Sequence, residues 1–169
     1  MTASASPQPP GRTPDALDAT QREQALRHFE ANLDRIAWLL RGTPVVVSTV
    51  ASDLNIAPTE RCLAEGCPHP IWARAQNERD PLRRRELLVE AKDLDPMSIR
   101  APSEVNTILR RVADRHGLLL MDLEAELPRA RDADVPDSAL FRDTLHFSDQ
   151  GMFEVADTVA AWLRDRQLP

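Results

Sequence analysis

This chain has 169 residues, 42% of them hydrophobic, which is enough for one domain with a core of its own. Its formal net charge of −6 argues against a nucleic-acid partner, and no apolar run approaches the roughly 20 residues that a membrane span needs. Because the N-terminus also lacks the hydrophobic stretch of a secretory signal, we expect a cytoplasmic protein with no membrane partner.

The chain opens with residues 1–16, which are rich in proline and small polar residues and are expected to form a disordered tail. A long amphipathic helix is predicted next, because apolar residues recur at steps of three and four: Leu26, Phe29, Leu33, Ile36 and Leu40. Gly42 is expected at the C′ position of this helix, and Pro44 prevents its continuation.

Residues 44–50 are β-branched and nearly all apolar, a pattern typical of a buried strand in a parallel sheet. The segment 51–70 contains one glycine and several prolines and is expected to be a loop. A second helix is predicted from Pro81 to about Leu94, with Asp80 as its N-cap, because proline fits the first helical position. We expect residues 56–94 to form an insert made of this loop and helix.

A third helix is expected to begin with Ser103 as its cap and to end at Gly117, with these residues facing inward: Val105, Ile108, Leu109 and Val112. Residues 118–123 predict a second buried strand, and residues 128–142 a loop. The last helix is expected to turn the following residues toward the core: Met152, Val155, Ala156, Val159 and Leu163. The order of helices and strands indicates an α/β domain over residues 17–169.

Asp143 and His146 are the clearest candidates for chemistry. Side chains three residues apart can lie on one side of a single turn. The carboxylate can then accept a hydrogen bond from one ring nitrogen and leave the other free to take a proton, as in the base half of a Ser-His-Asp site. The alternative is that the two side chains form a hydrogen bond that only stabilises their loop.

Three blocks of the sequence resemble the C-terminal part of SGNH/GDSL-type hydrolases, and more narrowly the bacterial subgroup with inserted tetratricopeptide-like repeats. They are residues 45–54, residues 91–106, and residues 141–152, which hold the Asp-x-x-His block. The resemblance covers residues 28–166. It implies a partial three-layer, flavodoxin-like fold in which helices flank a short parallel sheet.

The chain also departs from that family. It contains no Gly-Asp-Ser, the block whose serine is the nucleophile, and it lacks the blocks that build the oxyanion hole. The first three strands of the expected five-stranded sheet are missing, and Asp53 stands where the subgroup usually has Asn. The resemblance therefore implies a hydrolase of carboxylic esters that is inactive as this chain alone.

The resemblance also implies roles for single residues. His146 is the general base, Asp143 orients it, and the substrate is an ester of a small molecule or a glycan, with no cofactor. Arg100 is a candidate substrate contact, with a surface ion pair as the equal alternative.

Ser52, just past the first strand, is a second substrate-binding candidate and could replace the missing nucleophile, although a loop hydrogen bond or turn cap is its alternative. Asp122 is expected to cap the next helix or to bond nearby backbone.

Cys62, Cys67 and His69 could suggest a metal site. Their Cys-x₄-Cys-x-His spacing lacks a fourth ligand, however, and fits no common zinc pattern. Two cysteines also make no disulfide framework. We therefore expect free loop thiols and no metal.

Two strands make a narrow sheet, which would leave Val45–Val50 exposed along an edge. The expected partners are a second copy of the chain or another polypeptide that pairs with this edge. An alternative function follows, namely a non-catalytic, degenerate domain that acts as a partner-binding or oligomerisation module.

Overall fold

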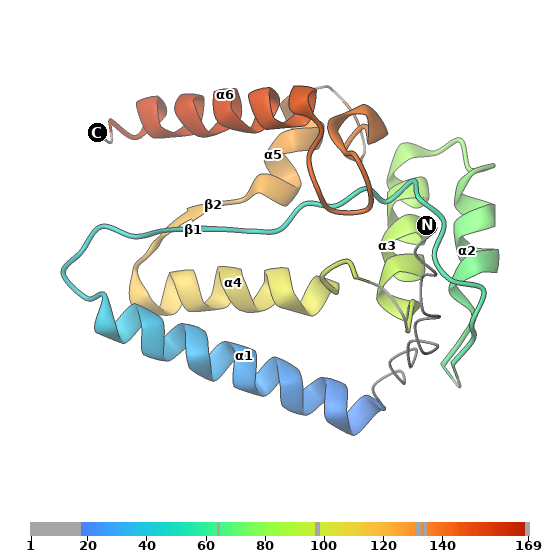
Figure 1. Cartoon of the computed structure of the whole chain (residues 1–169), viewed down its shortest axis with the longest axis horizontal. Helices are drawn as coiled ribbons and strands as arrows, with labels where there is room; N and C mark the ends of the chain where they lie inside the picture. Colours follow the sequence, from blue (N-terminus) through green and yellow to red (C-terminus); the bar gives the residue numbers. More distant parts are fainter. Residues whose placement is uncertain (1–17, 64, 97–98, 131–132, 134, 168–169) are drawn as a thin grey trace, which may run out of the picture.

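The computed structural model describes residues 18–63, 65–96, 99–130, 133 and 135–167, so the expected disordered tail lies outside the described residues. The chain is mostly helical, with a short parallel sheet between helices (Figure 1). Its elements are α1 (Ala19–Leu39), β1 (Val46–Ser48), α2 (Pro68–Ala75), α3 (Pro81–Leu94), α4 (Ser103–His116), β2 (Leu119–Met121), α5 (Leu123–Ala130), the 3₁₀ turn η1 (Ser138–Leu140) and α6 (Asp149–Asp165). In the described residues, no helix is both long and apolar enough to cross a membrane.

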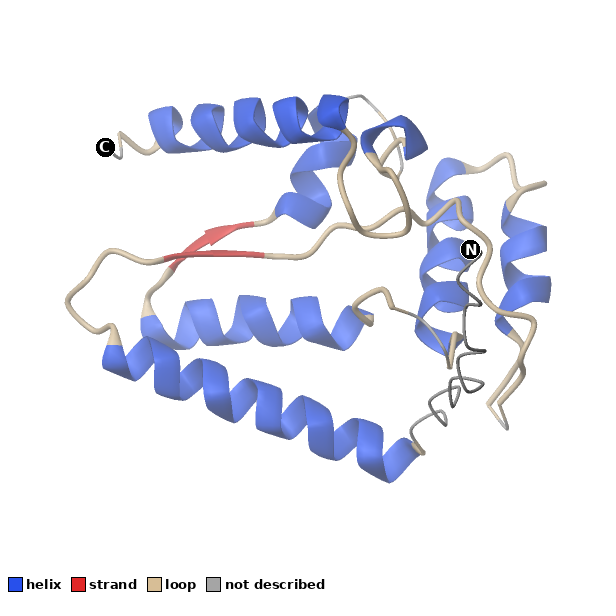
Figure 2. Cartoon of the chain, viewed as in Figure 1, coloured by secondary structure: helices blue, strands red, loops and turns tan. Residues whose placement is uncertain are grey.

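The two predicted strands pair with each other in parallel, as expected. Val46 lies opposite Leu119, and Ser48 lies opposite Met121. Helices α1 and α4 lie on one side of this pair, and α5 and α6 lie on the other (Figure 2). The mixed α/β class is therefore confirmed.

The prediction that both strands are buried is wrong for β1. Val46 is 46% exposed, and Val50, just past the strand, is 44% exposed. Among the described residues β1 pairs with β2 alone, so it is an edge strand. Met121 on β2 is buried at 3% exposure and belongs to the main core with Leu127, Leu140 and Trp162. The main core therefore lies toward β2, α5 and α6, and a second buried cluster that includes Leu87 and Leu88 lies at α2 and α3.

Helix α1 is confirmed, and it is tied to α4 by charge. Arg115 on α4 binds Glu30 at 2.7 Å and Asp34 at 2.7 Å. The apolar stripe expected on α1 is only partly covered, because Ile36 is 50% exposed. The C-cap is Leu40, so Gly42, with φ of 87°, lies one residue beyond the expected C′ position.

Helix α3 has the predicted bounds. The Asp80 carboxylate accepts a hydrogen bond from the backbone N–H of Arg83 at 2.8 Å. At α4, the expectation that Ser103 is the N-cap is wrong, because Ser103 is the first helical residue. Its N–H is satisfied by the carboxylate of Asp93 at 2.9 Å, from the last turn of α3. Gly117 ends α4 with φ of 62°, in the left-handed region that favours glycine.

Two helices lie where loop or strand was expected. Helix α2 begins at Pro68 inside the predicted loop 51–70, because a proline at the first helical position loses no hydrogen bond. Helix α5 begins at Leu123, the last residue of the predicted second strand, and buries Leu127. Both helices have eight residues, too few for a periodic apolar pattern to identify them.

The predicted inward face of α6 is partly wrong. Val155, Val159 and Leu163 pack against the core, whereas Met152 is 61% exposed and Ala156 is also exposed. Gly151 shares the buried face, and a Cβ atom there would lie 1.9 Å from the carbonyl oxygen of Leu140. Gly151 rather than Met152 therefore lies on the face of α6 that meets η1.

Candidate active site

The candidate dyad lies on a tight loop between η1 and α6. The ends of this loop are held by an antiparallel bridge between Phe141 and Phe147, whose rings stack with centroids 5.0 Å apart. Inside it, the N–H of Arg142 donates to the carbonyl of His146 at 2.7 Å. The loop therefore has its own packing and hydrogen bonds, which fix the backbone that carries Asp143.

The structure brings Asp143 and His146 together as the sequence predicts. Nδ1 of His146 lies 2.8 Å from Oδ2 of Asp143 and 3.0 Å from Oδ1. Oδ1 also accepts the backbone N–H groups of Leu145 at 3.0 Å and His146 at 2.9 Å. The carboxylate thus stabilises the turn and orients the imidazole at the same time. Both the catalytic and the loop-stabilising interpretations therefore agree with this geometry.

These hydrogen bonds lower the pKa of Asp143 to about 2, because the N–H groups of Leu145 and His146, followed by the imidazole, favour the ionised carboxylate. We expect carbon NMR to find this carboxyl titrating near pH 2. A lowered pKa in the folded state means that the ionised form stabilises the loop at all pH values above about 4, and that this contribution is lost as the pH falls toward the folded pKa. His146→Ala should leave most of the effect, since the two backbone donors remain. Titration of Asp143 at the ordinary value of 3.8 would contradict the geometry.

His146 is accessible for proton transfer. Its side chain is 70% exposed, and within the part of the chain that the structure describes nothing hydrogen-bonds to its Nε2. With Nδ1 facing the carboxylate, Nε2 is the nitrogen that can accept a proton. The arrangement can therefore serve as an oriented base.

The dyad loop lies beyond the carboxyl ends of the strands. Both strands end at this edge, at Ser48 and Met121. The chain then continues from β1 to Asp53, whose N–H donates to the carbonyl of Thr144 in the dyad loop at 3.1 Å. Figure 1 shows the dyad loop crossing the segment that follows β1. Ligands of α/β proteins bind at this edge of the sheet.

Neither Ser52 nor Ser148 is presented as a nucleophile. Ser52 is buried at 9% exposure, and within the described residues no hydrogen bond joins it to His146. Ser148 is used as the N-cap of α6, where its Oγ donates to the carbonyl of Ala139 at 2.7 Å and accepts the N–H of Gly151 at 3.1 Å. The structure thus gives no support to Ser52 as a replacement nucleophile.

Arg100 lies inside the protein, so the surface ion pair considered from the sequence is wrong. It is 5% exposed, and its guanidinium donates to the carbonyls of Asp53 at 3.2 Å and Ile56 at 3.0 Å. Burial lowers the pKa of Arg100, whereas the Asp95 carboxylate, 3.5 Å away, acts to raise it. Arg100 therefore holds the loop after β1 and positions the segment that contacts the dyad.

Asp122 belongs to a network of side chains at the same edge. The main partner of its carboxylate is Arg110, which binds it through Nε at 2.9 Å and Nη2 at 2.8 Å and lowers its pKa. The N–H of Ala125 donates to the backbone carbonyl of Asp122 at 3.0 Å. Thr49 donates its hydroxyl to Asp122 at 2.9 Å and accepts the N–H of Glu124 at 3.0 Å, so Thr49 caps α5. Sequence spacing alone does not predict this network, because Thr49 is 73 residues from Asp122.

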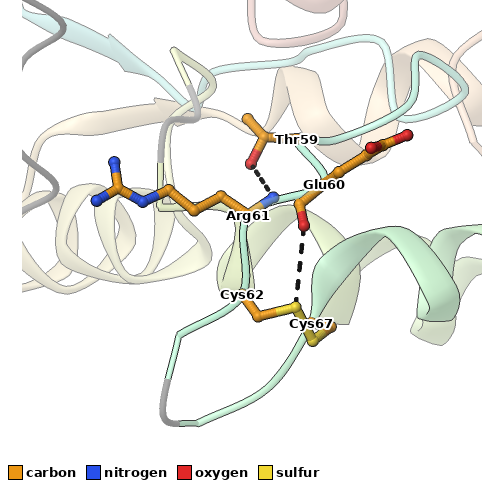
Figure 3. Close-up of a disulfide and its surroundings, with 5 residues drawn as sticks. All are labelled: Thr59, Glu60, Arg61, Cys62 and Cys67. Carbon is orange, nitrogen blue, oxygen red and sulfur yellow. Dashed lines mark hydrogen bonds between the residues drawn. A yellow bond between two sulfur atoms is a disulfide. The ribbon is translucent and has the colours of Figure 1, made fainter.

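Cys62 and Cys67 form a disulfide, which overturns both the free-thiol and the metal-site interpretations (Figure 3). The turn between them is closed by backbone hydrogen bonds of Leu63 and Gly66 to each other, at 2.9 and 3.2 Å.

Removing this cross-link should lower the free energy of unfolding by about 2 kcal/mol, because it closes a short loop in the unfolded chain. The measurement is urea unfolding of a double variant, Cys62→Ser with Cys67→Ser, against the parent chain. The parent after reduction is the matched control and should be as unstable as the variant. Alkylation of both thiols in the parent without a reductant would contradict the cross-link.

Comparison with family models, with curated proteins and with solved structures found no match for this chain. The likeness to SGNH/GDSL-type hydrolases therefore depends on the three sequence blocks, and the candidate site depends on its own geometry.

Proposed function

We propose that this chain is the C-terminal part of an SGNH/GDSL-type hydrolase of carboxylic esters, with His146 as its general base and Asp143 as the residue that orients it. The nucleophilic serine and the oxyanion donors come from a segment outside this sequence, so the chain is inactive alone. The sheet would then be part of a three-layer, flavodoxin-like fold, completed by further strands beside β1.

The observation that carries the proposal is the 2.8 Å contact between Asp143 and Nδ1 of His146, beyond the carboxyl ends of two parallel strands. In the completed site, Nε2 of His146 takes the proton of the serine hydroxyl as the serine oxygen attacks the ester carbonyl. The proton then passes to the leaving alcohol as the acyl–oxygen bond breaks, and water later releases the acyl group by the same route in reverse. A small-molecule or glycan ester is the proposed substrate, and the reaction needs no cofactor.

Two tests address this function. The first is the DNA upstream of the Met1 codon, where an in-frame Gly-Asp-Ser segment would support a hydrolase. The second is a serine-reactive fluorophosphonate probe, which should leave the isolated chain unlabelled. Labelling of Ser52 that depends on His146 would instead place the nucleophile in this chain and overturn the proposal that it is inactive alone.

The exposed edge of β1 favours a second candidate, a non-catalytic partner-binding or oligomerisation module. Val46 and Val50 are exposed there, and the C-terminal end of α1 exposes further apolar side chains: Ile36 at 50%, Trp38 at 57% and Leu39 at 60%. Exposed apolar surface beside an open strand edge is typical of an interface. A stop codon upstream, with no neighbouring gene for the missing half, would favour this candidate.

We expect light scattering to find the purified chain oligomeric, because the edge of β1 and the apolar end of α1 need a cover. Val46→Lys should shift the chain toward the monomer, since a lysine on an edge strand disfavours pairing. Leu82→Lys is the matched control, because Leu82 is 74% exposed but lies on α3. A monodisperse monomer of the parent chain would show that this edge has no partner in solution.

A further inference from the structure

A cavity of about 350 Å³ lies between α1, the end of α3 and the start of α4. Helices α1 and α4 are held together near their C-terminal ends and diverge toward their N-terminal ends (Figure 1). The cavity occupies the space where they diverge. Its volume falls in the range of small-molecule sites, and neither Asp143 nor His146 lines it.

The walls of the cavity are mostly apolar. Leu26 and Phe29 line it from α1, Val105 from α4, and Leu63 from the disulfide-closed turn. Leu26, Phe29 and Val105 are only half-buried, although each is a large apolar residue on a predicted inward face. A ligand with an apolar chain would cover them and remove their apolar surface from water, which favours binding.

A buried ammonium group lines the same cavity. Lys92 is 4% exposed, and its Nζ lies 3.1 Å from Oγ of Ser103 and 3.4 Å from Oδ1 of Asp93. An ammonium has three donors, and among the described residues Ser103 and Asp93 supply the two acceptors that reach it. A buried charge with an unused donor is costly unless a further acceptor reaches it.

The charges around the cavity favour an anion. Three cationic side chains line it, Arg22, Lys92 and Arg100. Two carboxylates lie against them, because Asp95 pairs with Arg100 and Asp93 lies 3.4 Å from Lys92, which leaves an excess of one positive charge. Arg22 donates to the backbone carbonyl of Asp93 at 3.2 Å, beside the Lys92 ammonium. That excess, beside an ammonium for which the described residues supply two acceptors, suits a group of single negative charge.

We propose that this cavity binds a small amphipathic carboxylate, a single apolar chain that ends in one carboxylate group. The carboxylate accepts from Nζ of Lys92 and lies near Arg22, and the chain lies between Phe29 and Val105. The proposal does not depend on the hydrolase function. Arg100 nevertheless borders this cavity and also holds the loop that contacts the dyad segment, so the two sites share one buried residue.

Calorimetric titration of the full chain with decanoate tests the proposal. Decanol has the same chain without the charge, and acetate has the charge without the chain. We expect decanoate to bind at least about tenfold more tightly than either, since a hydrogen bond to a charged group and the burial of the chain both contribute. Equal affinity for decanoate and decanol, or no binding of decanoate, would overturn the proposal.

Variants then locate the site. Lys92→Met keeps the length of the side chain without its charge and should remove the preference for decanoate over decanol, whereas Phe29→Ala should weaken the binding of both. Arg27→Gln is the control, because Arg27 is exposed and pairs with Glu23 on the outer face of α1. If Lys92→Met does not fold, Arg22→Gln carries the same test. A preference for decanoate that survives removal of either cation would overturn the assignment of the head group.

Discussion

Replacing His146 with alanine is expected to lower kcat/KM for p-nitrophenyl acetate by about 10²–10⁴-fold in a fusion protein that supplies a nucleophilic serine, because general base catalysis contributes that much. The nucleophile can be supplied by fusing the N-terminal half of a complete SGNH/GDSL-type hydrolase, with its Gly-Asp-Ser strand, ahead of α1. Asp143→Asn should cost up to about 10⁴-fold, because an imidazole without its carboxylate partner takes the wrong tautomer.

The chain offers a matched control for this experiment. His116 also pairs with a carboxylate, with its Nε2 2.9 Å from Oδ1 of Asp34, but it lies at the C-terminal end of α4. His116→Ala should leave the rate of the fusion unchanged. Equal losses from His116→Ala and His146→Ala would mean that the effect is one of folding and would remove the case for His146 as the base.

Replacing Asn106 with alanine is expected to lower the free energy of unfolding by about 2 kcal/mol. Asn106 is 1% exposed, its Nδ2 donates to the carbonyl of Val50 at 2.9 Å, and its Oδ1 accepts the N–H of Val50 at 2.8 Å. The side-chain amide thus pairs with the backbone after β1 as a neighbouring strand would. Alanine leaves the N–H and the carbonyl of Val50 without these partners, and each unsatisfied backbone group costs about 1–3 kcal/mol. Because Val50 is exposed, water hydrates these groups and offsets part of that cost.

Urea unfolding measures this effect, and Asn77→Ala is its control. The Asn77 amide donates to a backbone carbonyl, that of Ala73, at 3.0 Å, but it lies on the surface and should change the stability by less than about 0.5 kcal/mol. Because Asn106 fixes the segment that leads to Asp53 and the dyad loop, Asn106→Ala should also broaden the NMR signals of His146. Similar stability losses in both variants would show that the buried pairing with Val50 is unimportant.

Features set by neighbours in the sequence were predictable. Helix α3 begins at Pro81 and ends at Leu94 as expected, because Asp80 and the Asp95–Pro96 pair act within one turn of its ends. The Asp143–His146 contact was predictable for the same reason, since its two residues lie three positions apart on one turn. In both cases the information is local, and a single sequence contains it.

Features set by distant segments were not predictable. The exposure of Val46 depends on which strands flank β1, and the sequence of β1 does not contain that information. The role of Asn106 depends on a contact with Val50, 56 positions away. The Cys62–Cys67 disulfide required the turn between Leu63 and Gly66, and two cysteines counted in a sequence do not reveal that turn.

The central claim is that Asp143 holds His146 with its proton on Nδ1, so that Nε2 is free to act as a base. Heteronuclear NMR of the ring nitrogens measures this directly in the isolated chain, with no fused segment. We predict that neutral His146 is protonated on Nδ1 and that Asp143→Asn shifts the proton toward Nε2. A ring protonated on Nε2 in the parent chain, or a tautomer that Asp143→Asn leaves unchanged, would contradict the account.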